Sequence, residues 1–219
     1  MDFDALIRSI DWLWLEETVM RAFGILLCLT VHETCHGLAA CVLGDPTARE
    51  WRRLSLNPLR HIDWLGLAMM LAVGFGWAKP VPVDPRHFKK PRQGMALTAL
   101  AGPVSNFVLA FLATFFSCKV LRGLITSDTC PAYWLFVFLH LRVAPLSIGL
   151  GLFNLLPVPP LDGAKVLGAF LPERTYFGLM RYERYGMFLL LALSWFGVTG
   201  KLISGAILGI WDFFIELCL

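Results

Sequence analysis

The sequence is poor in charge, because only 16% of its 219 residues are Asp, Glu, Lys or Arg. An average globular chain carries about 25% charged residues. Hydrophobic residues make up 57% of the chain, and its mean hydropathy is +0.66. This composition excludes a disordered chain, a basic nucleic-acid-binding arm and an ordinary cytosolic enzyme, and it favours a protein of the lipid bilayer. The length fits one domain over residues 1–219.

The sequence also lacks the features of a secreted, disulfide-rich protein. It has no Cys-X-X-Cys pair, and four of its six cysteines lie inside apolar runs, where cysteine is typical of a small buried side chain. The first 17 residues hold five acidic side chains against one arginine, so they lack the basic start of a signal peptide. We find no internal repeat and no interdomain linker.

Four runs are apolar and long enough to cross a membrane, which takes about 20 residues in a helix. These runs are residues 22–43, 94–118, 143–161 with an extension over 163–171, and 186–211. Residues 64–78 form a run of only 15 with three glycines, so we expect this segment to enter the membrane and return, or to lie at its surface. Residues 5–15 carry two tryptophans and predict an interfacial lead-in helix.

The basic residues are unevenly placed and predict an orientation. Residues 44–63, 79–92 and 162–184 together hold 13 of the 19 Lys and Arg. The positive-inside rule puts these three loops in the cytoplasm, so both termini lie outside. The predicted fold class is an all-α polytopic membrane protein with about four transmembrane helices and one short re-entrant or interfacial segment.

Polar side chains stand in the middle of the first predicted span as His-Glu-Thr-Cys-His. His32 and His36 are four residues apart, so on a helix they share one face and can bind one zinc ion. Glu33 is then placed to act as general base on a water molecule activated by that zinc. The alternative is a pair of structural histidines, but it leaves a buried, unpaired glutamate, which is costly.

A zinc hydrolase needs a third protein ligand, and Asp162 is the carboxylate in the most unusual setting. It follows three prolines in Phe-Asn-Leu-Leu-Pro-Val-Pro-Pro-Leu-Asp-Gly, which cannot form a regular helix. Irregular backbone at membrane depth is tolerated where it lines a cavity or is buried in protein. The alternative role for Asp162 is the N-cap of a helix over 163–171. The presence of the two histidines favours metal ligation.

These motifs resemble those of the site-2 protease family of intramembrane zinc metalloproteases. The resemblance rests on the histidine motif at 32–36, Ala-Gly-Pro-Val-Ser-Asn at 101–106 and Asn-Leu-Leu-Pro-Val-Pro-Pro-Leu-Asp-Gly at 154–163. It covers a core of about residues 20–172, with 186–211 as an additional transmembrane helix. Gly-Trp-Ala-Lys-Pro-Val-Pro-Val-Asp-Pro at 76–85 resembles the compact bacterial branch without a PDZ or CBS domain.

The resemblance implies one zinc ion per chain, held by His32, His36 and Asp162, with Glu33 as the catalytic base. It also implies that Asn154 holds the scissile carbonyl or its oxyanion. The implied partners are single-span membrane proteins, cleaved in or near their transmembrane segment, and the implied location is the bacterial inner membrane with the active site opening toward the cytoplasm. No nucleic-acid partner is expected.

Two other classes compete with a protease. A transporter with a regulatory zinc site is one, although its midplane site usually comes from repeated halves, which this sequence lacks. A membrane-protein binder with a structural zinc site is the other. Cleavage of a reporter span distinguishes a protease from both. The sequence also leaves open whether residues 76–83 form an edge that holds an unwound substrate strand or only a rigid loop at the membrane surface.

Overall fold

The computed structural model describes residues 11–73, 76–128, 130–181 and 183–219. Its α-helices are α2 (Trp12–Val42), α3 (Thr47–Glu50), α4 (Trp64–Val73), α5 (Pro91–Lys119), α6 (Pro131–Phe136), α7 (Ala144–Asn154), α8 (Asp162–Gly168), α9 (Glu173–Arg181), α10 (Glu183–Trp195) and α11 (Val198–Cys218). The 3₁₀ turns are η1 (Pro58–Arg60), η2 (Pro85–His87) and η3 (Leu121–Leu124), and η4 (Val137–Val143) is a π-helix. No strand occurs in the part of the chain described.

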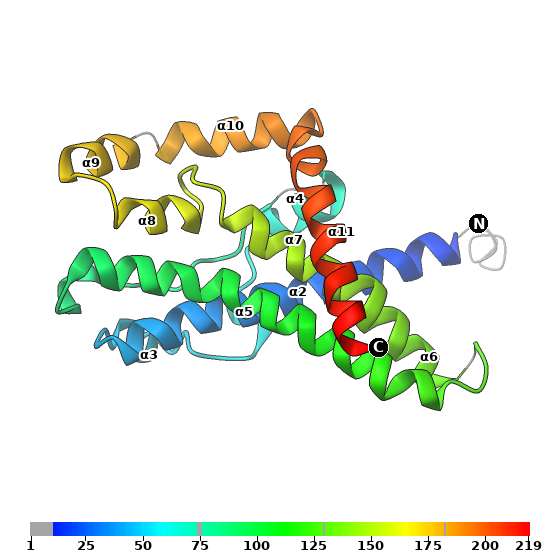
Figure 1. The fold of residues 1–219 in the computed structure, drawn as a ribbon. Coiled ribbons are helices and arrows are strands. Elements are labelled where there is room, and N and C mark those ends of the chain that lie inside the picture. The colour runs from blue at the N-terminus through cyan, green and yellow to red at the C-terminus, as the bar shows by residue number, and fades with distance from the viewer. Residues whose placement is uncertain (1–10, 74–75, 129, 182) are drawn as a thin grey trace, which may run out of the picture.

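Helix α5 lies at the centre of the fold, against α2 on one side and against α7 and α8 on the other (Figure 1). The buried core joins Cys28 of α2 and two alanines of α5 to Val143 at the end of η4 and to Ala144 and Ile148 of α7. Small side chains let membrane helices approach closely, and this is how helices that face apolar lipid gain packing contacts. The core therefore holds α2, α5 and α7 in a fixed relation, and these three elements carry most of the site.

Four helical segments of the described residues are long and apolar enough to span a membrane: 12–42, 91–124, 131–154 and 198–218. The start of α2, the short helix α6 and the end of α11 lie at one end of the molecule, and α3 and α9 lie at the other (Figure 1). The chain is thus an all-α, multi-pass membrane protein, as its composition predicts. Its cysteines are all free thiols.

The boundaries of the spans differ from those predicted. The first helix already begins at Trp12, so the described part of the predicted 5–15 helix is continuous with the first span; residues 5–10 lie outside the described residues. The third span begins earlier, at Pro131, and ends at Asn154. Its end is set by Pro157, Pro159 and Pro160, which cannot continue a helix.

The predicted fourth run, 186–211, is divided into α10 and α11. Helix α10 ends at Trp195 and α11 begins at Val198. Between them Gly197 has φ 68°, a left-handed conformation that glycine adopts without strain. A hydropathy plot does not detect this interruption, because one glycine hardly changes the mean hydropathy of an apolar run.

Helix α4 has ten residues and is about 15 Å long at 1.5 Å per residue, half the thickness of the hydrocarbon core. The chain that follows it returns beside its start: a Cβ atom added at Gly66 would meet the carbonyl oxygen of Trp77 at 2.0 Å. Helix α2 runs toward the end that carries α3, and α5 starts from that same end (Figure 1). Within the described part of 64–78, this arrangement agrees with a segment that enters and returns.

The arrangement predicts that the loops before and after α4 face the same side of the membrane. Cysteines introduced at Leu56 and Lys89, one on each side of α4 in sequence, are therefore expected to react with an impermeant thiol reagent from the same side. Both positions are exposed, and the native cysteines would be replaced first. Labelling of the two positions from opposite sides would mean that residues 64–78 cross the membrane.

Candidate metal centre

The middle of α2 places two imidazoles on one face. His32 and His36 are 3% and 9% exposed, and their Nε2 atoms are 3.0 Å apart. Each imidazole is fixed at its other nitrogen, because His36 Nδ1 lies 2.7 Å from the carbonyl oxygen of Thr98 and His32 Nδ1 lies 3.2 Å from the side-chain amide of Asn106. Both partners belong to α5, so the central helix sets the orientation of both rings.

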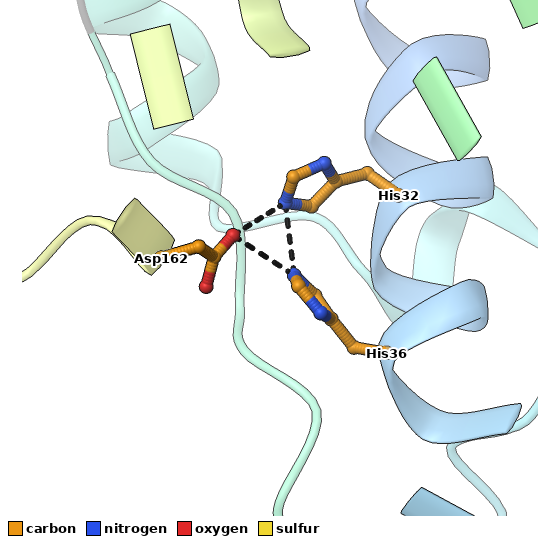
Figure 2. Close-up of side chains that lie close together, drawn as sticks. All are labelled: His32, His36 and Asp162. Carbon is orange, nitrogen blue, oxygen red and sulfur yellow. Dashed lines mark hydrogen bonds and ion pairs between the residues drawn. The ribbon is translucent and has the colours of Figure 1, made fainter. Parts of the chain in front are cut away.

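Asp162 is brought to the histidines by the irregular segment that precedes it. Its Oδ2 atom lies 3.1 Å from Nε2 of His32 and 3.1 Å from Nε2 of His36, and Figure 2 shows the three side chains converging. Helix α8 begins at Asp162 itself, and its N-cap is Leu161, without a side-chain hydrogen bond. The structure therefore does not use Asp162 as the N-cap of α8, which was the alternative role that the sequence allowed.

The protonation of these groups fits a bound cation. A backbone carbonyl only accepts hydrogen bonds, so the contact with Thr98 puts the proton of a neutral His36 on Nδ1 and leaves a lone pair on Nε2. That lone pair faces a carboxylate oxygen and a second imidazole nitrogen at 3.0–3.1 Å. A cation between these three atoms would satisfy all of them at once, and two imidazoles with one carboxylate are ligands that zinc accepts.

Two residues of α5 shape the site around the imidazoles. A Cβ atom added at Gly102 would lie 2.4 Å from Nε2 of His36 and 2.7 Å from Cε1 of His32, so only glycine leaves room for the pair. Asn106 is completely buried, and its Oδ1 atom has no hydrogen-bond partner among the described residues. The amide orientation that turns Oδ1 toward His32 Nδ1 satisfies that oxygen and leaves His32 Nε2 with a lone pair for a cation.

Glu33 is also buried, at 9% exposure, and its carboxylate is held from outside the helix. Its Oε2 atom accepts a hydrogen bond from the backbone N–H of Val81 at 3.0 Å. Val81 lies in the extended segment between α4 and α5. Oε1 is left available for a molecule inside the site.

Two cavities meet at these residues. A cavity of about 280 Å³ is lined by the three converging side chains, by Glu33 and by Asn154. A second cavity, of about 460 Å³, shares His32, Glu33 and Asn154 with the first and continues along α2 to Arg21. Apolar side chains of α2, α7, α10 and α11 form most of its wall. The polar site therefore opens into an apolar space inside the membrane-spanning part of the protein.

Asn154 is the last residue of α7 and borders both cavities. Its Nδ2 atom donates one hydrogen bond to the carbonyl oxygen of Leu150 at 3.0 Å. A side-chain amide has a second N–H, so one donor remains for another acceptor. The structure places Asn154 beside the site, although not among the groups that converge on one point.

A multi-pass helical fold with a buried His-Glu-X-X-His helix and a converging aspartate defines a membrane-embedded metalloprotease. Comparison with known proteins supports this class. The sequence profile of "Peptidase family M50" matches residues 123–196. The chain is 37% identical over 177 residues to "Putative zinc metalloprotease YwhC" of Bacillus subtilis (strain 168), a match that covers 77% of each protein.

Two further relatives carry the same type of name. Rip2 of Mycolicibacterium smegmatis is 30% identical over 175 residues, which are 78% of this chain and 64% of Rip2. MJ0611 of Methanocaldococcus jannaschii is 38% identical over 93 residues, or 41% of this chain and 43% of that protein. No solved structure matches. The chain belongs to the M50, or site-2 protease, family, and it is a membrane zinc metalloprotease.

Sequence reasoning found the converging side chains but not the groups that orient them. In the sequence Asn106 is only the last residue of the motif at 101–106, and the structure shows its contact with His32. Thr98 acts through its backbone carbonyl, for which a sequence carries no signal. Val81 likewise acts through its backbone N–H. The sequence does carry one signal for Val81: it lies between two prolines, which have no N–H, so its own N–H is an isolated backbone donor.

Proposed function

We propose that this chain is an intramembrane endopeptidase that hydrolyses peptide bonds in or near the transmembrane segment of single-span membrane proteins. One observation carries the proposal: His32, Glu33 and Asn154 of the polar site also line an apolar cavity of about 460 Å³ that extends along α2. An apolar cavity between membrane helices suits an apolar, membrane-embedded peptide better than a soluble one. Along α2 the distance from Arg21 to Glu33 is about 18 Å at 1.5 Å per residue, enough for about five extended substrate residues.

In this proposal His32, His36 and Asp162 hold one zinc ion, which, when bound, supplies the Lewis acidity that makes water nucleophilic near neutral pH. Glu33 takes a proton from the attacking water while the water oxygen bonds to the scissile carbonyl carbon. As the carbon–nitrogen bond breaks, Glu33 gives that proton to the leaving amine. Asn154 donates its second N–H to the oxygen that becomes negative.

The proposed location is the cell membrane of a bacterium, with the site opening toward the cytoplasm. The imidazoles lie in the half of α2 that is nearer to α3, and the loop that carries α3 is rich in arginine. By the positive-inside rule this end of the molecule is cytoplasmic.

A rate measurement tests the role of Asn154. Replacement by alanine is expected to lower the cleavage rate roughly 10²–10³-fold if the amide donates to the oxyanion. Replacement by aspartate keeps the shape but offers no donor at neutral pH, so it should be as slow as alanine. An aspartate variant that cleaves within about a factor of three of the wild type would demote Asn154 to a packing role.

A further inference from the structure

The carboxylate of Glu33 accepts a hydrogen bond from a segment in which a proline stands on each side of the donor residue. The N–H of Val81 donates to Oε2 of Glu33 at 3.0 Å. Its neighbours Pro80 and Pro82 have no N–H, so a shift of the segment by one residue in either direction would remove the hydrogen bond. The contact therefore does not survive a one-residue shift of residues 79–84, and the position of this segment must be fixed by other contacts.

One anchor lies just before Val81. The N–H of Lys79 donates to the carbonyl oxygen of His61 at 2.9 Å. The guanidinium of Arg53 donates to the carbonyl oxygens of Lys79 and Pro80, at 2.8 and 3.2 Å. These contacts hold the backbone on the approach to Val81.

A second anchor lies just after Val81. The N–H of Asp84 donates to Oδ2 of Asp45 at 2.7 Å, and Asp45 is completely buried. Burial alone would raise the pKa of Asp45, but hydrogen bonds from Thr47 and from the Asp84 N–H, together with the contact of His87 Nδ1 at 2.9 Å, lower it below its usual value. Asp45 is therefore a carboxylate anion, and such an anion accepts stronger hydrogen bonds than a neutral group does.

Both anchors are connected to the helix that carries Glu33. Asp45 and Arg53 lie in the loop that follows α2, and the carbonyl oxygen of Ser55 in that loop accepts hydrogen bonds from Thr34 of α2, at 3.0 Å, and from His61, at 2.7 Å. Contacts thus connect α2 to the loop, the loop to residues 79–84, and residues 79–84 back to Glu33 of α2. A continuous path of contacts therefore leads from either anchor to the carboxylate.

We propose that Asp45 and Arg53 are positioning residues that fix the carboxylate of Glu33 through the N–H of Val81. The inference rests on the proposed function, in which Glu33 is the base. With Oε2 held, Oε1 is left for the attacking water in a side chain that lines both cavities, whereas a released carboxylate rotates and samples unproductive orientations. Misplacement of a catalytic group by about 1 Å can cost about 10²-fold in rate. The sequence leaves open whether this segment holds a substrate strand or forms a rigid surface loop. In this proposal it has a further role, which is to position the catalytic base.

The test is a double-mutant cycle on cleavage of a single-span reporter by the purified full-length protein, with kcat, KM and zinc content measured for each variant. Val81→Pro removes the N–H, and Val81→Ala removes the side chain but keeps the N–H. We expect kcat of Val81→Pro to be at least about tenfold below that of Val81→Ala. KM should change by less than about threefold, and zinc should stay at one per chain.

Asp45→Asn and Arg53→Gln each weaken one anchor and are expected to lower kcat about 10–100-fold. Combined with Val81→Pro, neither should slow the enzyme further by more than about threefold, because the hydrogen bond they support is already gone. Arg86→Gln is the matched control for Arg53: it removes an exposed arginine of the same region whose side chain bonds, among the described residues, only the side chain of Asp84. Its kcat should stay within about twofold of the wild type.

Two outcomes would overturn the inference. One is a kcat of Val81→Pro equal to that of Val81→Ala. The other is a double variant whose kcat falls by the product of the two single-variant losses. If Asp45→Asn does not accumulate in the membrane, Arg53→Gln carries the test alone. Failure of the proposed function gives a different result: a Glu33→Gln variant that still cleaves the reporter would show that Glu33 is not the general base.

Discussion

Replacement of Glu33 by glutamine is expected to lower the cleavage rate by orders of magnitude and to leave the zinc content unchanged. Glutamine has the shape of glutamate, and its side-chain oxygen can still accept the Val81 N–H, so the fold and the metal site are kept. It cannot take a proton from water. General base catalysis contributes about 10²–10⁴-fold, and the same loss of rate is expected here. Reporter cleavage and elemental analysis of one preparation measure both quantities.

Glu16→Gln is the matched control for this experiment. It changes a glutamate of the same helix that is exposed at the other end. This control should cleave at the wild-type rate. A Glu33→Gln variant with near wild-type activity would rule out Glu33 as the base, and one that has lost its zinc would show that Glu33 supports the metal site instead.

Replacement of Asp162 by alanine is expected to remove zinc and activity together. The carboxylate is one of three groups that meet at 3.0–3.1 Å, and a site with one ligand fewer binds zinc far more weakly. The remaining imidazoles would also lose the only anion in contact with both of them among the described residues. Zinc per chain after dialysis against a weak chelator should fall from one to near zero.

Asp128→Ala is the control for this replacement, because Asp128 is exposed in the loop between η3 and α6. It should keep both zinc and activity. If Asp162→Ala kept full zinc occupancy, the third ligand would have to be another group. The aspartate would then act on the histidines only by hydrogen bonding.

The three converging side chains could be predicted because each has a local signal. The spacing of His32 and His36 places them on one face of a helix, whatever the rest of the fold does. Asp162 is conspicuous because prolines precede it and because a carboxylate at membrane depth needs a partner. The structure brings the three together, and their role as zinc ligands stays a prediction.

The spans could be predicted only as approximate windows of hydropathy. Their number and the brevity of α4 follow from composition and length. The end of α10 depends on a single backbone angle at Gly197, and the early start of the third span depends on Pro131 as the first residue of a helix. Both are local conformational effects that a hydropathy average does not register.

The groups around the site could not be predicted, because they act across long sequence separations. Asn106 meets His32 across 74 residues, and Val81 meets Glu33 across 48. In the sequence Asp45 has no feature that distinguishes it from other aspartates in loops. Only the fold shows that it receives the N–H of Asp84 and thereby anchors the segment over the base.

Cleavage by the purified protein in lipid vesicles tests the central claim most directly. A single-span reporter is incubated with the zinc-loaded protein, and mass spectrometry identifies the new termini. The account predicts a cut in or near the apolar segment, which stops when a chelator removes the metal and resumes when zinc is restored. A reporter that stays intact with the zinc-loaded protein, or cleavage that persists without metal, would contradict it.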